Sequence, residues 1–215
     1  MLVSKLISIA EDQCDEPLDS TQDWIDLFNL CQDDLTLVAK MLVPIDDIAV
    51  TVTSGKASIV IADDAGLSTA HRILNVYYTP ASGKEIEMRR LQPRDSYSKG
   101  WKLDTVNLYL QGLGTESTGI VRVDIYKKLS HITYVESPES YTPASPEIPE
   151  EYHGMYISWL CAKNQQREEE PSDKADFMSE YSQTKQTFAI DRLREMEPWN
   201  MKELQMIQAQ QGGEE

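Results

Sequence analysis

The stretch STQDWIDLFNLCQDDLTLVAKMLVPIDDIAVTVTSGKASIVI, residues 20–61, contains a change from a helical pattern to a strand pattern. Over residues 24–42 the apolar side chains recur at steps of three and four, which predicts an amphipathic helix. Ser20 is a suitable N-cap for this helix, and Pro44 is expected to end it. A shorter apolar stripe over residues 2–10 predicts another helix before it.

The middle of the chain has the two-residue period of strands. Apolar and polar residues alternate on both sides of Ser54-Gly55-Lys56, which predicts a β-hairpin over residues 49–61. Further strand candidates are residues 72–78, 85–90, 106–110, 120–127 and 132–135. The glycine-rich stretch 112–119 joins two of them and is interpreted as a hairpin loop. Short strands of this kind favour a small antiparallel sandwich or barrel.

Helical spacing returns near the end of the chain. Prolines every few residues predict an extended connector, and Pro149 suits the first position of a helix. A break near residues 168–173 has Ser172 as an N-cap for the next helix. The outer helices each have an apolar stripe that they cannot bury alone, so we expect an α+β fold in which a helical bundle from the N- and C-terminal segments carries an inserted antiparallel β-sandwich or barrel domain. The predicted parts are residues 1–48 (N-terminal helices), 49–137 (β domain), 138–149 (connector), 150–196 (helical hairpin) and 197–215 (C-terminal segment).

The composition limits the function classes. Lys and Arg total 20 against 36 for Asp and Glu, a formal net charge of -16, and hydrophobic residues make up 40%. This apolar content is enough for a core, and the negative charge argues against nucleic-acid binding through a basic face. No apolar run approaches the roughly 20 residues of a membrane helix, and the N-terminus lacks the features of a signal peptide. We therefore expect a soluble protein that is intracellular when made and has no membrane partner.

Few residues suggest chemistry. Cys14, Cys31 and Cys161 lie in helical patterns, which favours buried reduced thiols. The histidines are isolated, whereas a zinc site needs clustered ligands, and His153 is interpreted as a partly exposed structural residue. No nucleophile motif is present. We expect no metal, no cofactor and no enzymatic activity.

The C-terminal segment has apolar residues that it is too short to bury by itself. They are Trp199, Met201, Leu204, Met206 and Ile207. The segment either folds back on its own bundle or binds a partner as a helix in a groove.

Two stretches resemble a known family. They are ILNVYYTPASGKEIEMRRLQPRDSY (residues 73–97) and PEIPEEYHGMYISWLCAKNQQREEEPSDKADFMSEYSQTKQTF (residues 146–188). Together they resemble the head-to-tail adaptor proteins of tailed bacteriophages, the group that includes the tail tubular protein A type. The shared order is a strand-rich part with Val-Tyr-Tyr, a proline-rich connector, Ile148-Pro149-Glu150-Glu151-Tyr152-His153, and a second helix with Phe177 and Tyr181 near its start.

The resemblance implies a virion protein that is made in the host cytoplasm and forms a ring, commonly of twelve copies. Its partners would be itself, the portal, and a tail or nozzle protein, while genomic DNA passes through without specific binding. The C-terminal segment would engage the portal. Acidic residues of the helical zone would face the channel, with a solvated outer face as the alternative; the candidates are Glu168, Glu169, Glu170, Asp173 and Asp176.

Other function classes remain open. Another tail or baseplate component would share the acidic α+β character. A non-viral interaction module would leave the proline connector and the apolar C-terminal segment without a role. An enzyme is the third class.

Overall fold

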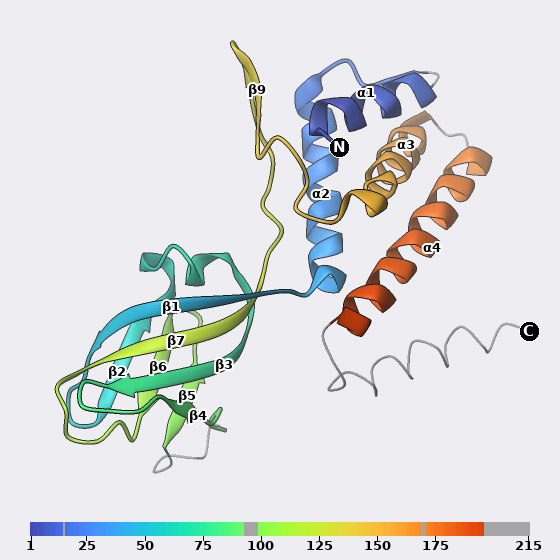
Figure 1. Cartoon of the computed structure of the whole chain (residues 1–215). Helices are drawn as coiled ribbons and strands as arrows, with labels where there is room; N and C mark the ends of the chain where they lie inside the picture. The colour runs from blue at the N-terminus through green and yellow to red at the C-terminus, as the bar shows by residue number, and fades with distance from the viewer. Residues whose placement is uncertain (15, 93–98, 169–170, 196–215) are drawn as a thin grey trace, which may run out of the picture. The chain divides into compact units, whose positions relative to one another are not determined.

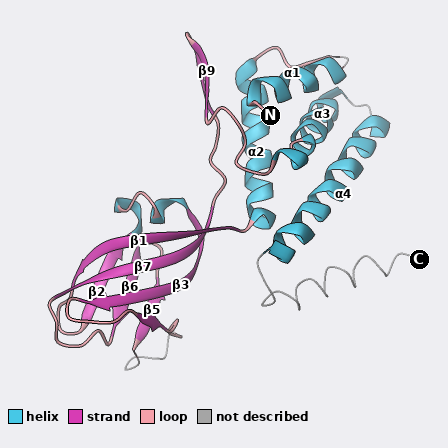
Figure 2. Cartoon of the chain, viewed as in Figure 1, coloured by secondary structure: helices cyan, strands magenta, loops and turns pink. Residues whose placement is uncertain are grey.

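The computed structural model describes residues 1–14, 16–92, 99–168 and 171–195. In these residues the chain is mixed α+β, with four α-helices and antiparallel sheets. It divides into two compact units, which are described separately (Figures 1 and 2). The helical unit consists of Met1–Lys40 and Leu129–Glu215, and the β unit consists of Met41–Lys128.

The first two helices of the helical unit agree with the sequence pattern. Helix α1 spans Val3–Gln13 and buries Val3, Leu6, Ile7 and Ala10 of its predicted apolar stripe, whereas Leu2 precedes the helix and is exposed. Helix α2 spans Thr21–Ala39, and Ser20 Oγ accepts a hydrogen bond from the backbone N–H of Gln22 at 3.2 Å, which confirms the predicted N-cap.

The predicted end of α2 is wrong. The helix ends at Ala39 because Lys40 has a left-handed conformation, with φ of 42°, and strand β1 begins at the next residue. Pro44, the expected helix stop, lies inside β1 instead. β1 is an edge strand, where a proline that cannot donate to a ladder is tolerated. Residues 41–48 therefore belong to a strand and not to the N-terminal helices.

Two longer helices complete the helical unit. After a 3-10 turn over Glu150–Tyr152, helix α3 spans Gly154–Glu168 and helix α4 spans Pro171–Glu195 (Figure 1). Pro149 thus precedes the 3-10 turn and does not begin an α-helix, and Ser172 lies within the first turn of α4. In the core, Phe28 of α2 stacks on Tyr156 of α3 with ring centroids 4.2 Å apart. Their contact joins the N-terminal and C-terminal segments of the chain.

The β unit has two antiparallel sheets. One has the order β1-β7-β3-β4 and the other the order β2-β6-β5. The strands span Met41–Thr51 (β1), Lys56–Val60 (β2), Ala70–Pro80 (β3), Ile86–Met88 (β4), Gly100–Leu103 (β5), Asn107–Gln111 (β6) and Thr118–Lys127 (β7). Buried residues of both sheets form one hydrophobic cluster that includes Tyr78, Trp101, Leu108 and Val123. The alternating burial along β7 shows why the two-residue period was informative.

The two predicted hairpins are corrected. The chain does turn at Ser54 and Gly55, which both have positive φ, but only Thr53 and Lys56 pair across the turn. β1 pairs with β7, and β2 pairs with β6, so the turn connects the two sheets. The loop over residues 112–117 likewise leads from β6 in one sheet to β7 in the other. Both strands at each turn have an apolar face, and placing them in different sheets lets these faces share one core.

The predicted connector contains a strand. Strand β9, Glu139–Thr142, pairs with β8, Thr133–Glu136, and both belong to the helical unit. Pro138 and Pro143 flank β9 on its two sides and leave its ladder intact. The β unit accordingly ends at Lys128, whereas the pattern predicted a β domain that continues to residue 137.

Candidate functional site

The helical unit has a groove of about 450 Å³ between α2 and α4. Trp159 of α3 also lines it. The lining residues are Asp34, Val38, Trp159, Met178, Tyr181, Ser182, Lys185, Gln186 and Ala189. They come from both ends of the sequence, which meet only in the folded helical unit.

Helical spacing explains why these residues face one groove. The six lining residues of α4, from Met178 to Ala189, follow one another at steps of three, one, three, one and three. Side chains at such steps lie on one face of a helix. Asp34 and Val38 of α2 are four residues apart and share a face in the same way.

Aromatic rings form the apolar part of the groove. The rings of Trp159 and Tyr181 are 5.0 Å apart and tilted by 56°. Trp159 Nε1 donates a hydrogen bond to the backbone oxygen of Leu27 at 3.0 Å, and Lys163 Nζ lies 4.5 Å from the Trp159 ring centroid. The ring is therefore held in place by α2 and by a cation–π contact within α3.

Hydrogen bonds to Asp34 connect α4 with α2 beside these rings. Lys185 Nζ donates a hydrogen bond to Asp34 Oδ2 at 2.5 Å, and the Tyr181 hydroxyl donates to the same oxygen. Burial acts to raise the pKa of Asp34, but the hydrogen bonds from Lys185 and Tyr181 outweigh it and the pKa is lowered. Burial, together with the nearby Cys31 and Asp34, raises the pKa of Tyr181. The hydroxyl thus stays a neutral donor and the carboxylate stays charged, which fixes α4 to α2.

The chemistry that this groove offers is recognition. Ring faces, Met178, Val38 and Ala189 can receive apolar side chains, and Ser182 and Gln186 can bond polar groups at the rim. Such a lining suits the apolar face of a helix.

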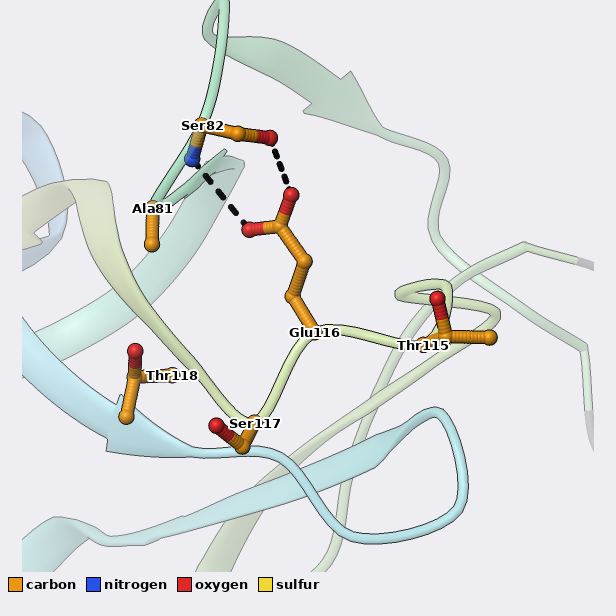
Figure 3. Close-up of a pocket in the computed structure, with 6 residues that line it drawn as sticks. All are labelled: Ala81, Ser82, Thr115, Glu116, Ser117 and Thr118. Atoms are coloured by element: carbon orange, nitrogen blue, oxygen red, sulfur yellow. Dashed lines mark hydrogen bonds between the residues drawn. The ribbon is translucent and has the colours of Figure 1, made fainter.

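A second pocket of about 440 Å³ lies between two loops of the β unit (Figure 3). The side chain of Glu116 reaches from one loop to Ser82 of the other. Its carboxylate accepts hydrogen bonds from the Ser82 hydroxyl and, at 3.3 Å, from the Ser82 backbone N–H. The bond from the Ser82 hydroxyl is the main cause that lowers the pKa of Glu116. The carboxylate therefore serves to tie the two loops together.

Most predicted site residues lie at or beyond the limits of the described chain. Asp176 is exposed on α4. Glu168 ends α3 and Asp173 lies in the first turn of α4, but their side chains are outside the described part. Glu169 and Glu170 lie wholly outside it, as do the predicted docking residues Trp199, Met201, Leu204, Met206 and Ile207.

His153 and the cysteines have structural positions. His153 is 3% exposed, which corrects the expectation that it is partly exposed; its Nε2 bonds the backbone oxygen of Ile148 at 2.9 Å, and burial lowers its pKa. Cys14, Cys31 and Cys161 are buried thiols, as predicted. Over residues 1–14, 16–92, 99–168 and 171–195, no group of three or more His, Cys, Asp or Glu side chains could hold a metal ion.

The sequence patterns did not predict the groove, and neither Asp34 nor Lys185 was a candidate site residue. A usable signal was present, because Trp159–Lys163 and Tyr181–Lys185 repeat the same aromatic-to-lysine step of four residues on two helices.

Two comparisons, with models of protein families and with curated proteins, give no match. No model of a protein family matches the chain, and a search of curated proteins finds no relative. Among the described helices, none combines the length and the apolar content needed to cross a membrane.

Proposed function

We propose that the protein is a structural virion protein, a head-to-tail adaptor whose copies form a ring between the portal and the tail of a tailed bacteriophage. The supporting observation is the layout of the chain. Segments from both ends build the helical unit, and the middle builds a unit of two antiparallel sheets with a common core. We interpret this layout as a helical bundle with an inserted β-sandwich, which is the arrangement that the resemblance to the adaptor family implies.

The distribution of charge supports a role as a DNA conduit. The helical unit has 26 acidic and 9 basic residues, and the β unit has 10 and 11. A channel wall that formed many phosphate contacts would hold the DNA back, because each contact releases counterions. An acidic wall repels DNA at distances below the Debye length of about 8 Å. We therefore assign the channel-facing surface to the helical unit. Of the five acidic candidates, Asp176 is the one whose side chain is described, and it is exposed.

The direct test is the copy number in purified particles, measured against the portal by quantitative mass spectrometry. A ratio near one to one supports a symmetric ring at the neck. A ratio far above one would assign the protein to the tail or capsid, and absence from particles would refute a virion role. Electron microscopy of the purified protein mixed with portal rings tests the same proposal without infection.

The channel assignment has a test of its own. A variant with five substitutions should slow DNA ejection, because the wall would then attract phosphate: Glu168→Lys, Glu169→Lys, Glu170→Lys, Asp173→Lys and Asp176→Lys. A matched variant with five lysines at exposed acidic positions of the β unit has the same change in charge and should eject DNA normally. Equal rates in wild type and the helical-unit variant would refute the assignment.

A further inference from the structure

We propose that the groove between α2 and α4 binds the C-terminal segment of the same chain, residues 196–215. This segment lies outside the described residues, and it follows directly after α4, the helix that lines one side of the groove. The inference concerns the protein before assembly and does not depend on the proposed function.

The groove continues along α2 as an exposed apolar stripe. Leu30 and Leu37 are 54% and 58% exposed. In a helix they fall with Asp34 and Val38 within an arc of about 100°. Single exposed leucines need no explanation, but these two extend a groove that already has aromatic and aliphatic walls. The stripe and the groove together form a surface that can bind one more helix.

The remaining chain is long enough to cover this surface. Helix α4 runs from Ser182, within the groove, to its end at Glu195, a rise of about 20 Å. Residues 199–211, which precede a Gly-Gly pair, would rise by the same about 20 Å as a helix. Residues 196–198 include Pro198 and provide a connection of the length common between antiparallel helices. The segment can thus return along α4 to about Ser182.

The segment also has the side chains that such a groove receives. In a helix, Trp199, Leu204, Met206 and Ile207 fall within an arc of about 160°. An antiparallel return that starts beside Glu195 brings residues 206 and 207 opposite residues 187 and 188, between Gln186 and Ala189 of the groove. Apolar side chains would then cover the part of the groove that water now reaches.

A segment of the same chain binds the groove more readily than a separate partner with similar side chains. A tether of three residues gives a high effective concentration, so modest contacts suffice. If the protein is an adaptor, the same residues are those assigned to the portal. The groove and the portal would then compete for one segment, and free subunits would keep it covered until they meet the portal.

The test is amide hydrogen exchange of the full chain, read for residues 199–211. The wild type should exchange about tenfold more slowly there than the variant Ile207→Glu, which places a charge on the docking face. Gln205→Glu makes the same change in charge on the opposite side of the segment and should retain the protection. Residue 207 is not among the residues that line the groove, so the Ile207→Glu variant leaves the groove itself unchanged.

A second pair of variants probes the groove. Ala189→Glu should remove the protection, whereas Ala175→Glu, the same change at an exposed position of α4, should retain it. Fast exchange of residues 199–211 in the wild type would overturn the proposal. Protection that increases with protein concentration would also overturn it, since the occupant would then be the segment of a second copy.

Discussion

Different interactions link distant parts of the chain within the helical unit and within the β unit. In the helical unit, side-chain amides bond the backbone of distant segments: Asn29 donates to Ile132 O at 3.0 Å and accepts from Ile132 N–H at 2.7 Å, and Asn164 donates to Glu16 O at 2.9 Å. In the β unit, backbone ladders such as β1–β7 make the long-range links. We conclude that polar side chains supply specific long-range hydrogen bonds in the first unit, whereas backbone ladders supply them in the second.

The largest effect is expected for Phe28→Ala in the helical unit. Phe28 is fully buried and stacks on Tyr156, so its loss should lower the free energy of unfolding of this unit by about 3–5 kcal/mol. Hydrogen exchange in increasing urea can read the peptides of α2 and of β7 separately. The control is Leu2→Ala at a 54% exposed position, with an expected change within about 0.5 kcal/mol. An equal loss in β7 would show that the two units unfold as one.

The next effect concerns the β unit. A Cβ atom at Gly119 would lie 2.3 Å from Cε2 of Tyr78, a ring that is itself buried. Gly119→Ala should therefore destabilise the β unit by about 1–3 kcal/mol, measured in the same experiment. Gly154→Ala is the matched control, because a Cβ there meets nothing within 4 Å and α3 begins at this residue. It should stabilise the helical unit slightly, and destabilisation by both would contradict the packing argument.

Two asparagines make hydrogen bonds of different kinds in the two units. Asn29→Ala leaves the backbone N–H and oxygen of Ile132 without their partner and should cost the helical unit about 1–2 kcal/mol. Asn75→Ala in the β unit removes a bond to the Asp124 side chain at 3.2 Å. It should cost less, because the ladder between β3 and β7 remains. Thermal unfolding of the two variants gives the order, and the reverse order would refute the distinction between the units.

The smallest effect is a dependence on pH. The pKa of Asp34 is lowered in the folded protein, so the stability from its ionised form is complete above its ordinary value of 3.8 and is lost as the pH falls through the lowered pKa. Asp34→Asn should lower the free energy of unfolding by about 1 kcal/mol at pH 7, a modest amount because the group is partly exposed. Below pH 4 the loss should be smaller. Asp23→Asn changes the net charge equally at an exposed position of α2. A cost of Asp34→Asn that is the same at pH 3 and pH 7 would contradict the role of the carboxylate.

The sequence predicted single elements better than their connections. The stripes of α1 and α2 and the strands β3, β6 and β7 follow from periodicity, because one face of each is buried. The end of α2 could not be predicted in the same way, since Lys40 takes a left-handed conformation that no residue type near it signals. The turn at Ser54-Gly55 was found, but turn residues do not reveal which sheet the next strand joins.

The candidate groove shows the same limit. Tyr181 was predicted to lie near the start of a helix, but the sequence contains no information on which other helix it contacts. Its contact with Asp34 joins residues 147 positions apart, and only the fold brings them together. The predicted channel and portal residues rest on the resemblance, and these assignments stay predictions.

The ends of the β unit have a consequence for protein engineering. Met41, where the chain enters it, is the ladder partner of Lys127, where it leaves. Antiparallel partners have Cα atoms about 5 Å apart, a gap that one or two residues can close. The β unit can therefore be exchanged as a whole. A short turn could replace it, and a foreign domain whose two termini lie close together could be inserted at the same position.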